Sequence, residues 1–205
     1  MNFIDVIETL GIASFALSGA ISAIRKRLDV FGVLIITFVT CIGGGTVRDI
    51  LIGSLPVAWM QDIYVITTIF ISYLIALFFY RHVIYLAKIN FWLDTIGLAL
   101  FCTIAVKKGI DFHMSAPVCV ALGTITGCFG GIIRDVLLNE IPYVFRKDIY
   151  ASACIAGGSM YFIVLWLSQN ENLAEIICGS TIVSIRICTV FFNWRLPLIY
   201  KKEEH

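Results

Sequence analysis

Seven long apolar runs constrain this chain more than any other feature of its sequence. The hydrocarbon core of a bilayer is roughly 30 Å thick, and a helix needs about 20 apolar residues to cross it. With 60% hydrophobic and only 14% charged residues, the 205-residue chain lacks the polar side chains that a water-facing surface requires. We therefore predict an all-α polytopic membrane protein of seven transmembrane helices. The predicted spans are Phe3–Ile24, Val30–Leu51, Asp62–Tyr80, Phe91–Val106, Ser115–Leu138, Ile149–Leu167 and Leu173–Trp194.

The charge balance and the reactive side chains exclude several classes of protein. A net charge of +1 leaves no basic surface for a nucleic acid. Nearly all of the seven cysteines lie inside apolar runs, and none has Cys-x-x-Cys spacing, which favours packing over metal or redox chemistry. The histidines His82, His113 and His205 are scattered along the chain. We therefore expect no catalytic set, no metal site and no cofactor, and the chain is not expected to be an enzyme.

Lys and Arg residues are distributed unevenly between the two sides of the predicted bundle. If the N-terminus is outside, ten of the 15 basic residues fall in inner loops and the C-terminal tail, whereas only Lys107 and Lys108 fall in outer loops. Cytoplasmic loops of membrane proteins carry such an excess. We predict a multi-pass protein of the inner (plasma) membrane with its N-terminus outside and its C-terminus in the cytoplasm. The ten residues are Arg25, Lys26, Arg27, Arg81, Lys88, Arg146, Lys147, Arg195, Lys201 and Lys202.

The chain contains an internal repeat. Gly-Gly-Thr-Val-Arg-Asp at Gly44–Asp49 recurs as Gly-Gly-Ile-Ile-Arg-Asp at Gly130–Asp135, 86 residues further on. Nine of 21 positions are identical between Gly44–Tyr64 and Gly130–Tyr150. The same offset aligns further residues: Glu8 with Asp94, Gly11 with Gly97, and Phe15 with Phe101.

Each copy of the repeat holds three predicted spans. Because three is odd, the second copy must enter the membrane from the opposite side. Inverted repeats of this kind recur in proteins that move solutes across membranes. We predict a first three-helix repeat over residues 1–86 and an inverted second repeat over residues 87–172. Residues 173–205 then form the seventh transmembrane helix and a cytoplasmic tail.

Consecutive glycines interrupt the second and fifth predicted spans. They are Gly43, Gly44 and Gly45 in the second, and Gly130 and Gly131, which follow Phe129, in the fifth. Glycine costs a helix roughly 1 kcal/mol per residue relative to alanine, so a kink or an unwound turn is expected here. Carbonyl oxygens freed in such a turn can replace the water around a cation. The alternative is that the glycines only let two helices pack closely.

Four charged residues lie inside the same two spans. An ionisable residue within the membrane is by default a functional hypothesis, so we predict that Arg48, Asp49, Arg134 and Asp135 line a polar permeation path. Adjacent helical positions diverge by about 100°, so we do not expect Arg48 to pair with Asp49, or Arg134 with Asp135. Pairing across the repeats, Arg48 with Asp135 or Arg134 with Asp49, is conceivable. A purely structural network of ion pairs is the alternative.

Several other side chains approach the glycine segments. Threonine hydroxyls there either join a hydrated path or bond to their own helix backbone, and the Phe38 and Phe129 rings either constrict a path or pack in the core. Arg186 in the seventh span either snorkels to the inner face or neutralises Asp94 or Asp135. Further candidates to line the path are Thr37, Phe38, Thr40, Thr124 and Thr126.

The paired Gly-Gly-x-x-Arg-Asp motifs, followed by Pro56 and Pro142, resemble the bacterial and archaeal branch of the TRIC family, the trimeric intracellular cation channels. The resemblance covers essentially the whole chain. It implies a homotrimer in the lipid bilayer, with an hourglass pore in each protomer that is kinked at the glycines and conducts monovalent cations such as K⁺ and Na⁺. The positive Arg48 and Arg134 are unusual beside a cation path and suggest either a gate or a plug that leaves the path with voltage. Since the same sequence domain has also been labelled a glycine transporter, the alternative is a secondary carrier of a small zwitterion such as glycine.

Overall fold

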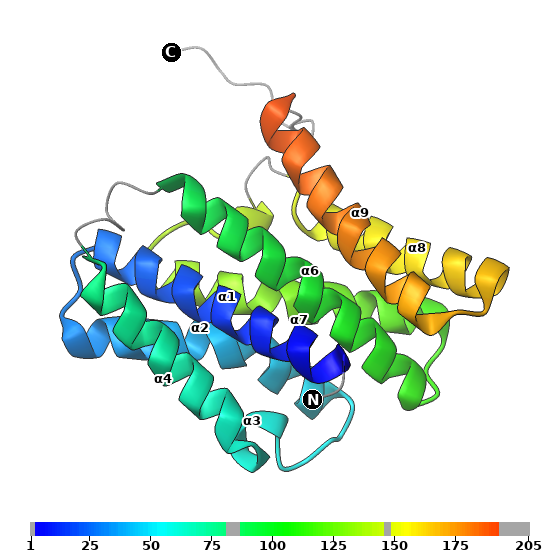
Figure 1. The fold of residues 1–205 in the computed structure, drawn as a ribbon, viewed down its shortest axis with the longest axis horizontal. Helices are drawn as coiled ribbons and strands as arrows, with labels where there is room; N and C mark the ends of the chain where they lie inside the picture. The colour runs from blue at the N-terminus through cyan, green and yellow to red at the C-terminus, as the bar shows by residue number, and fades with distance from the viewer. Residues whose placement is uncertain (1–2, 81–86, 146–148, 193–205) are drawn as a thin grey trace.

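The computed structural model describes residues 3–80, 87–145 and 149–192, which form an α-helical bundle (Figure 1). Several residues used above lie outside these ranges: His82, Trp194, His205, Arg81, Arg146, Lys147, Arg195, Lys201 and Lys202. The helices are α1 (Phe3–Arg25), α2 (Val30–Leu51), α3 (Ala58–Gln61), α4 (Ile63–Phe78), α6 (Ala87–Asp111), α7 (Ala116–Leu137), α8 (Ala151–Ser168) and α9 (Glu171–Phe191), with a 3₁₀ turn, η1, at Tyr143–Phe145.

Six of the seven predicted spans are confirmed as helices long and apolar enough to cross a membrane, namely α1, α2, α6, α7, α8 and α9. The remaining one, α4, is apolar but has only 16 residues. The fourth span is longer than predicted, because α6 continues from Ala87 to Asp111 rather than ending at Val106. Lys107 and Lys108 stay within this helix because each of them is paired with an acidic side chain of a neighbouring helix.

Side-chain caps and left-handed residues set the ends of the helices. Asp29 accepts a hydrogen bond from Gly32 N at the start of α2 (2.7 Å), as expected for an N-cap residue. The chain leaves α1 and α6 at residues with positive φ, Arg27 (58°) and His113 (55°). It leaves α2 and α7 at Gly53 (71°) and Asn139 (54°). Both pairs are separated by the offset of the sequence repeat, so the chain turns at equivalent points in the two halves.

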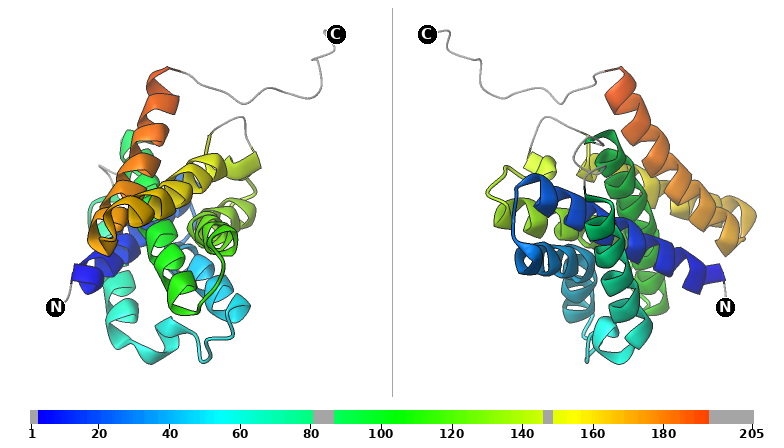
Figure 2. Two further views of the ribbon diagram at one scale, coloured as in Figure 1. Left: turned by 90° about the vertical axis from the view of Figure 1, so that its right-hand side faces the viewer. Right: turned by 60° about the vertical axis from the view of Figure 1, so that its left-hand side comes forward.

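Four helices form the centre of the molecule. Helix α1 packs against α2 and α6, and α7 packs against the same two helices. Helix α4 flanks α1 and α2, while α8 packs on α7 and α9 packs on α6 and α8 (Figures 1 and 2). The two flanking groups therefore lie on opposite sides of the four-helix centre.

Contacts at the centre are reciprocal between the two halves of the sequence. The rings of Phe15 and Phe101, which the offset of 86 relates, meet with centroids 5.1 Å apart. Gly11 faces Phe101, and its counterpart Gly97 faces Phe15. The side chains of Phe15 and Phe101 are almost fully buried, so these reciprocal contacts form the middle of the core.

Candidate functional site

The glycine segments form the crossing of α2 and α7. A Cβ on Gly44 would overlap the carbonyl oxygen of Thr126, and a Cβ on Gly130 would overlap the carbonyl oxygen of Thr40. Both helices are continuous through their glycines, so the unwound turn predicted there is wrong. Close approach of the two backbones accounts for the glycines instead, because only a residue without Cβ fits at this contact.

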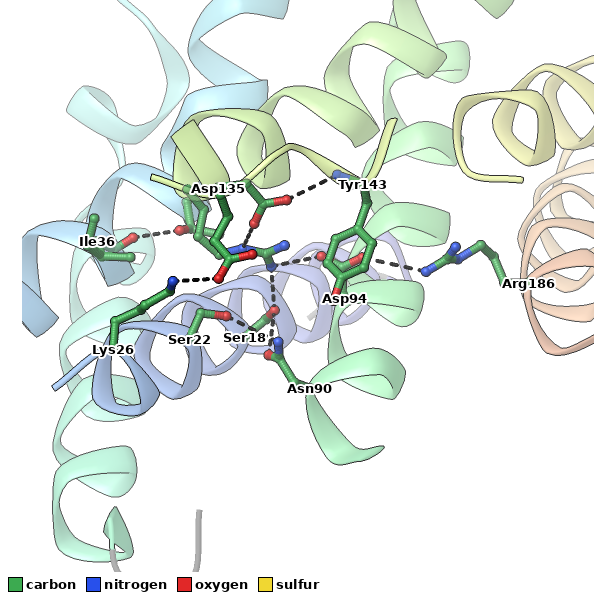
Figure 3. Close-up of polar contacts among 12 residues, drawn as sticks. Ser18, Ser22, Lys26, Ile36, Asn90, Asp94, Asp135, Tyr143 and Arg186 are labelled. Atoms are coloured by element: carbon green, nitrogen blue, oxygen red, sulfur yellow. Dashed lines mark hydrogen bonds and ion pairs between the residues drawn. The ribbon is translucent and has the colours of Figure 1, made fainter. Parts of the chain in front are cut away.

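Next to the crossing, Arg134 is the centre of a buried polar network. Its guanidinium, on a side chain that is 1% exposed, donates to Asp135 Oδ1 (2.8 Å), Asp94 Oδ1 (2.8 Å) and Ser18 Oγ (2.7 Å). Ser18 in turn donates to Asn90 Oδ1 at 3.0 Å. Hydrogen-bonded side chains from α1, α6 and α7 therefore surround the Arg134 charge (Figure 3).

Arg48 occupies the equivalent place in the first half. Its Nε and Nη2 lie 2.9 Å and 2.8 Å from Asp49 Oδ1. Lys108 from α6 reaches the same oxygen at 2.9 Å. The buried Asp49 carboxylate thus binds two cations, one from its own helix and one from the other half of the sequence.

The expectation that neighbouring Arg and Asp residues do not pair is wrong, since both Arg48–Asp49 and Arg134–Asp135 are ion pairs. The angular argument holds for short side chains, but the long arginine side chain can turn back along its helix. The guanidinium then lies beside the glycine three positions earlier, since the site of a Cβ on Gly45 is 3.9 Å from Arg48 Nη2. In the part of the chain that the structure describes, no ion pair joins the Arg-Asp motifs of the two repeats.

Asp49 and Asp135 also hold the loops that follow their helices. Asp49 Oδ2 accepts a hydrogen bond from Ala58 N at 2.8 Å. Asp135 Oδ2 accepts one from Tyr143 N at 3.2 Å. Each carboxylate therefore joins a buried guanidinium to a backbone amide of the next segment, which fixes the Arg-Asp motif at the end of its helix.

Two cavities approach these charges from opposite ends of the four-helix centre. The Arg134 cavity, about 370 Å³, is lined by Ser22, Arg25, Lys26, Asn90, Arg134 and Asp135 among others, at the end of α1 and the start of α6. The Arg48 cavity, about 310 Å³, is lined by Glu8, Arg48, Lys107, Lys108 and Asp111 among others, at the start of α1 and the end of α6. Both cavities carry basic and acidic side chains, and each ends at one of the two buried arginines.

The aromatic pair Phe15–Phe101 lies between the two cavities, in the middle of α1 and α6. A third cavity, about 30 Å³, lies beside Gly45 and Arg48 and reaches Phe101. This volume holds one or two water molecules. Space accessible to water thus extends from the Arg48 cavity toward the middle, where the two rings and the α2–α7 crossing fill the core.

The threonines near the glycines all bond to their own helices. Thr37, Thr40, Thr124 and Thr126 each donate to the carbonyl oxygen four residues earlier, at 2.6 to 2.8 Å. Of the two aromatic candidates, Phe38 makes an edge contact with Trp59 at 5.4 Å between centroids, and Phe129 is half-buried. The structure thus places Thr37, Thr40 and Thr126 in the buried core.

Sequence reasoning did not select Ser18, Ser22, Asn90 or Lys108 for the site. Ser18 and Ser22 are four residues apart on α1, as are Asn90 and Asp94 on α6, so each pair lies on one helix face. Asn90 Nδ2 donates to Ser22 Oγ at 3.1 Å, which links the two faces. Polar residues at this spacing in apolar helices are the signal that would have found them.

Arg186 neutralises Asp94, one of its predicted alternatives. Its Nη2 is 4.0 Å from Asp94 Oδ2, and its guanidinium carbon lies 4.8 Å from the ring centres of both Phe91 and Tyr150. Among the described residues, no group of three or more His, Cys, Asp or Glu side chains is placed to hold a metal ion.

The fold and this site define a class of protein, the multi-pass membrane proteins with the fold of the TRIC cation channels. A solved TRIC cation channel matches with a TM-score of 0.87 and 34% identity, over 100% of both chains. The TRIC orthologue from Rhodobacter sphaeroides matches with a TM-score of 0.88 and 26% identity, over 94% of this chain and 100% of the orthologue.

Sequence comparison places the chain within a family of that class. It belongs to the UPF0126 family, whose profile, described as "Glycine transporter", matches residues 5–81 and 91–166. A UPF0126 membrane protein of Vibrio cholerae is 38% identical over 200 residues, covering 96% of this chain and 82% of the relative. The UPF0126 inner membrane protein YadS of Escherichia coli K12 is 35% identical over 196 residues, covering 93% of each.

Proposed function

We propose that this protein is a channel for monovalent cations, permeable to K⁺ and Na⁺, and that it works as a homotrimer in the inner membrane with one pore in each protomer. The pore runs between the Arg134 cavity and the Arg48 cavity, through the centre formed by α1, α2, α6 and α7. The two inverted repeats over residues 1–86 and 87–172 form its two halves. Helix α4 completes the first repeat as a transmembrane span, and residues 173–205 contribute the seventh span and the cytoplasmic tail.

One observation carries this proposal. Two charged cavities enter the same four-helix centre from opposite ends, and each ends at an Arg-Asp motif of one repeat. Ionisable groups in membrane spans typically face such water-filled space. Phe15 and Phe101 lie between the two cavities, which supports a closed state of the proposed channel. The likeness to solved TRIC cation channels over the full chain supports the same function.

The proposed residues have different roles in this path. Gly43, Gly44 and Gly130 bring α2 and α7 together at the narrowest point. Gly45, Phe129 and Gly131 lie next to this contact and are proposed to line the path. Arg48 and Asp49 end one cavity, and Arg134 and Asp135 end the other. Each guanidinium is paired with a neighbouring carboxylate, so the pair repels a cation in the pore only weakly. The pair must rearrange when the path opens.

Purified protein in planar lipid bilayers tests the proposal. We expect stepwise unitary currents that reverse near the K⁺ equilibrium potential in a KCl gradient and that persist when Na⁺ replaces K⁺. Vesicles loaded with labelled glycine provide the comparison. Saturable glycine counterflow without unitary currents would show instead the small-zwitterion carrier that the family description favours.

A second prediction concerns the orientation in the membrane. Leu28, in the loop after α1, is 40% exposed, and Phe112, in the corresponding loop after α6, is 44% exposed. We expect a cysteine at Leu28 (L28C) to react with a membrane-impermeant maleimide only from the cytoplasmic side, and one at Phe112 (F112C) only from the outside. The wild-type chain is the control, because six of its seven cysteines are buried. Labelling of both positions from one side would contradict the inverted arrangement.

A further inference from the structure

The two halves of the site obtain their positive charges from different places. In the first half, Asp49 is bound by Arg48 and by Lys108 of α6. The offset of 86 residues places Ser22 where the second half would need the counterpart of Lys108. The second half therefore has two buried acidic residues, Asp94 and Asp135, but inherits only one cation, Arg134, from the repeat.

Arg186 supplies the missing charge from outside the repeat. It comes from α9, and Figure 3 shows it reaching toward Asp94 on a side chain that is 3% exposed. Its Nη2 lies 4.0 Å from Asp94 Oδ2, while Arg134 binds Asp94 Oδ1 at 2.8 Å. With Arg186 present, Asp94 and Asp135 have two buried arginines beside them, Arg134 and Arg186. In the first half Asp49 likewise has two cations beside it, Arg48 and Lys108.

The surroundings of Arg186 fix its position. Its guanidinium lies 4.8 Å from the centres of the Phe91 and Tyr150 rings, and its Nη1 donates to Ile149 O at 3.4 Å. The planar guanidinium of arginine stacks on aromatic rings, which holds it in place better than the flexible ammonium group of lysine would be held. The side chain therefore contributes a fixed charge beside Asp94.

We propose that Arg186 is a positioning residue that balances the charge around Asp94 and thereby sets how strongly the Arg134 end of the path attracts cations. Asp94 lies one helical turn beyond Asn90, which lines the Arg134 cavity. Loss of the Arg186 charge makes this end more negative by one unit charge, whereas an added cation makes it more positive by one unit charge. This inference rests on the proposed channel function.

The experiment measures K⁺ over Cl⁻ permeability and unitary conductance at low salt for the wild type, R186K, R186Q, S22K and R186Q/S22K. We expect both quantities to rise about threefold in R186Q and to fall by about the same factor in S22K, the order that one unit charge at about 8 Å produces in a hydrated pore. R186K keeps the charge but not the planar contact with the two rings, so its permeability is expected to lie closer to that of the wild type than to that of R186Q. In R186Q/S22K a lysine beside Asp135 replaces the lost cation, so wild-type permeability is expected to return.

Thermal unfolding gives a readout that does not depend on current. We expect the midpoint to fall in R186Q and to recover in R186Q/S22K, because the second lysine restores the balance. The inference would be overturned if R186Q and S22K had the same permeability and conductance as the wild type. It would also be overturned if R186K behaved as R186Q does. A wild-type protein without currents would overturn the proposed channel instead, and the unfolding midpoints would still decide the charge balance. If R186Q does not assemble, the currents of S22K decide it.

Discussion

Alanine at Gly44 is expected to prevent stable folding. Its Cβ would overlap the carbonyl oxygen of Thr126, and neither backbone can move without separating α2 from α7. Overpacking of a buried contact typically costs about 1–3 kcal/mol, and a clash with backbone is at the upper end or beyond. We expect the same for alanine at Gly130, which faces the carbonyl oxygen of Thr40. Size-exclusion chromatography after a temperature series measures the loss.

Gly45 provides the matched control in the same glycine run. A Cβ there meets only Arg48 Nη2, at 3.9 Å, so there is space for the added methyl group. Alanine also favours a helix over glycine by roughly 1 kcal/mol. We therefore expect G45A to fold at least as well as the wild type. Equal thermal stability of G44A and G45A would show that the α2–α7 contact is not as close as the structure has it.

The second large effect is expected when Arg134 is replaced by methionine. This change leaves the buried Asp135 carboxylate without its guanidinium, and it leaves Asp94 with only Arg186, at 4.0 Å. Removing one partner of a buried ion pair typically costs about 3–5 kcal/mol. We expect R134M to lower the midpoint of thermal unfolding far more than a surface substitution does.

Two comparisons separate this electrostatic effect from a simple loss of packing. In R48M, Asp49 keeps its contact with Lys108 at 2.9 Å, so the loss of stability is expected to be smaller. In R134M/D135N the unpaired charge of Asp135 is removed as well, so part of the lost stability is expected to return. If R134M and R48M unfold at the same temperature, the charge on Lys108 does not compensate for Arg48.

The course of the helices could be predicted from hydrophobicity and repetition. The second span was predicted at Val30–Leu51, and α2 has these same ends. The reason is local, since Asp29 caps the start of this helix and Gly53 leaves it with positive φ. The offset of 86 residues likewise places Arg48 and Arg134 at equivalent ends of α2 and α7, although each was expected to follow a break at the glycines.

Features that depend on contacts between helices could not be predicted. Local propensity favours a break at Gly43–Gly45, but the approach of α7 keeps this part of α2 helical. The length of α6 was underestimated for a similar reason. Two adjacent lysines favour the end of a span, but in the fold Lys107 and Lys108 form ion pairs with Glu175 and Asp49, so the helix continues past them. The pairing of each arginine with the next aspartate depends on where the loop after the helix turns.

The aromatic pair at the centre has a consequence for how the two halves can diverge. Phe15 touches Phe101, its counterpart in the other copy. Gly11 faces Phe101, and its counterpart Gly97 faces Phe15, so the contacts at these positions join the two copies. A larger side chain in one copy must therefore be accommodated by a smaller one in the other. Far from this centre the copies are independent, and Tyr64 is 78% exposed while Tyr150 is buried. The central contacts therefore keep the two copies alike in the middle of the molecule, whereas residues at its edges can differ between the copies.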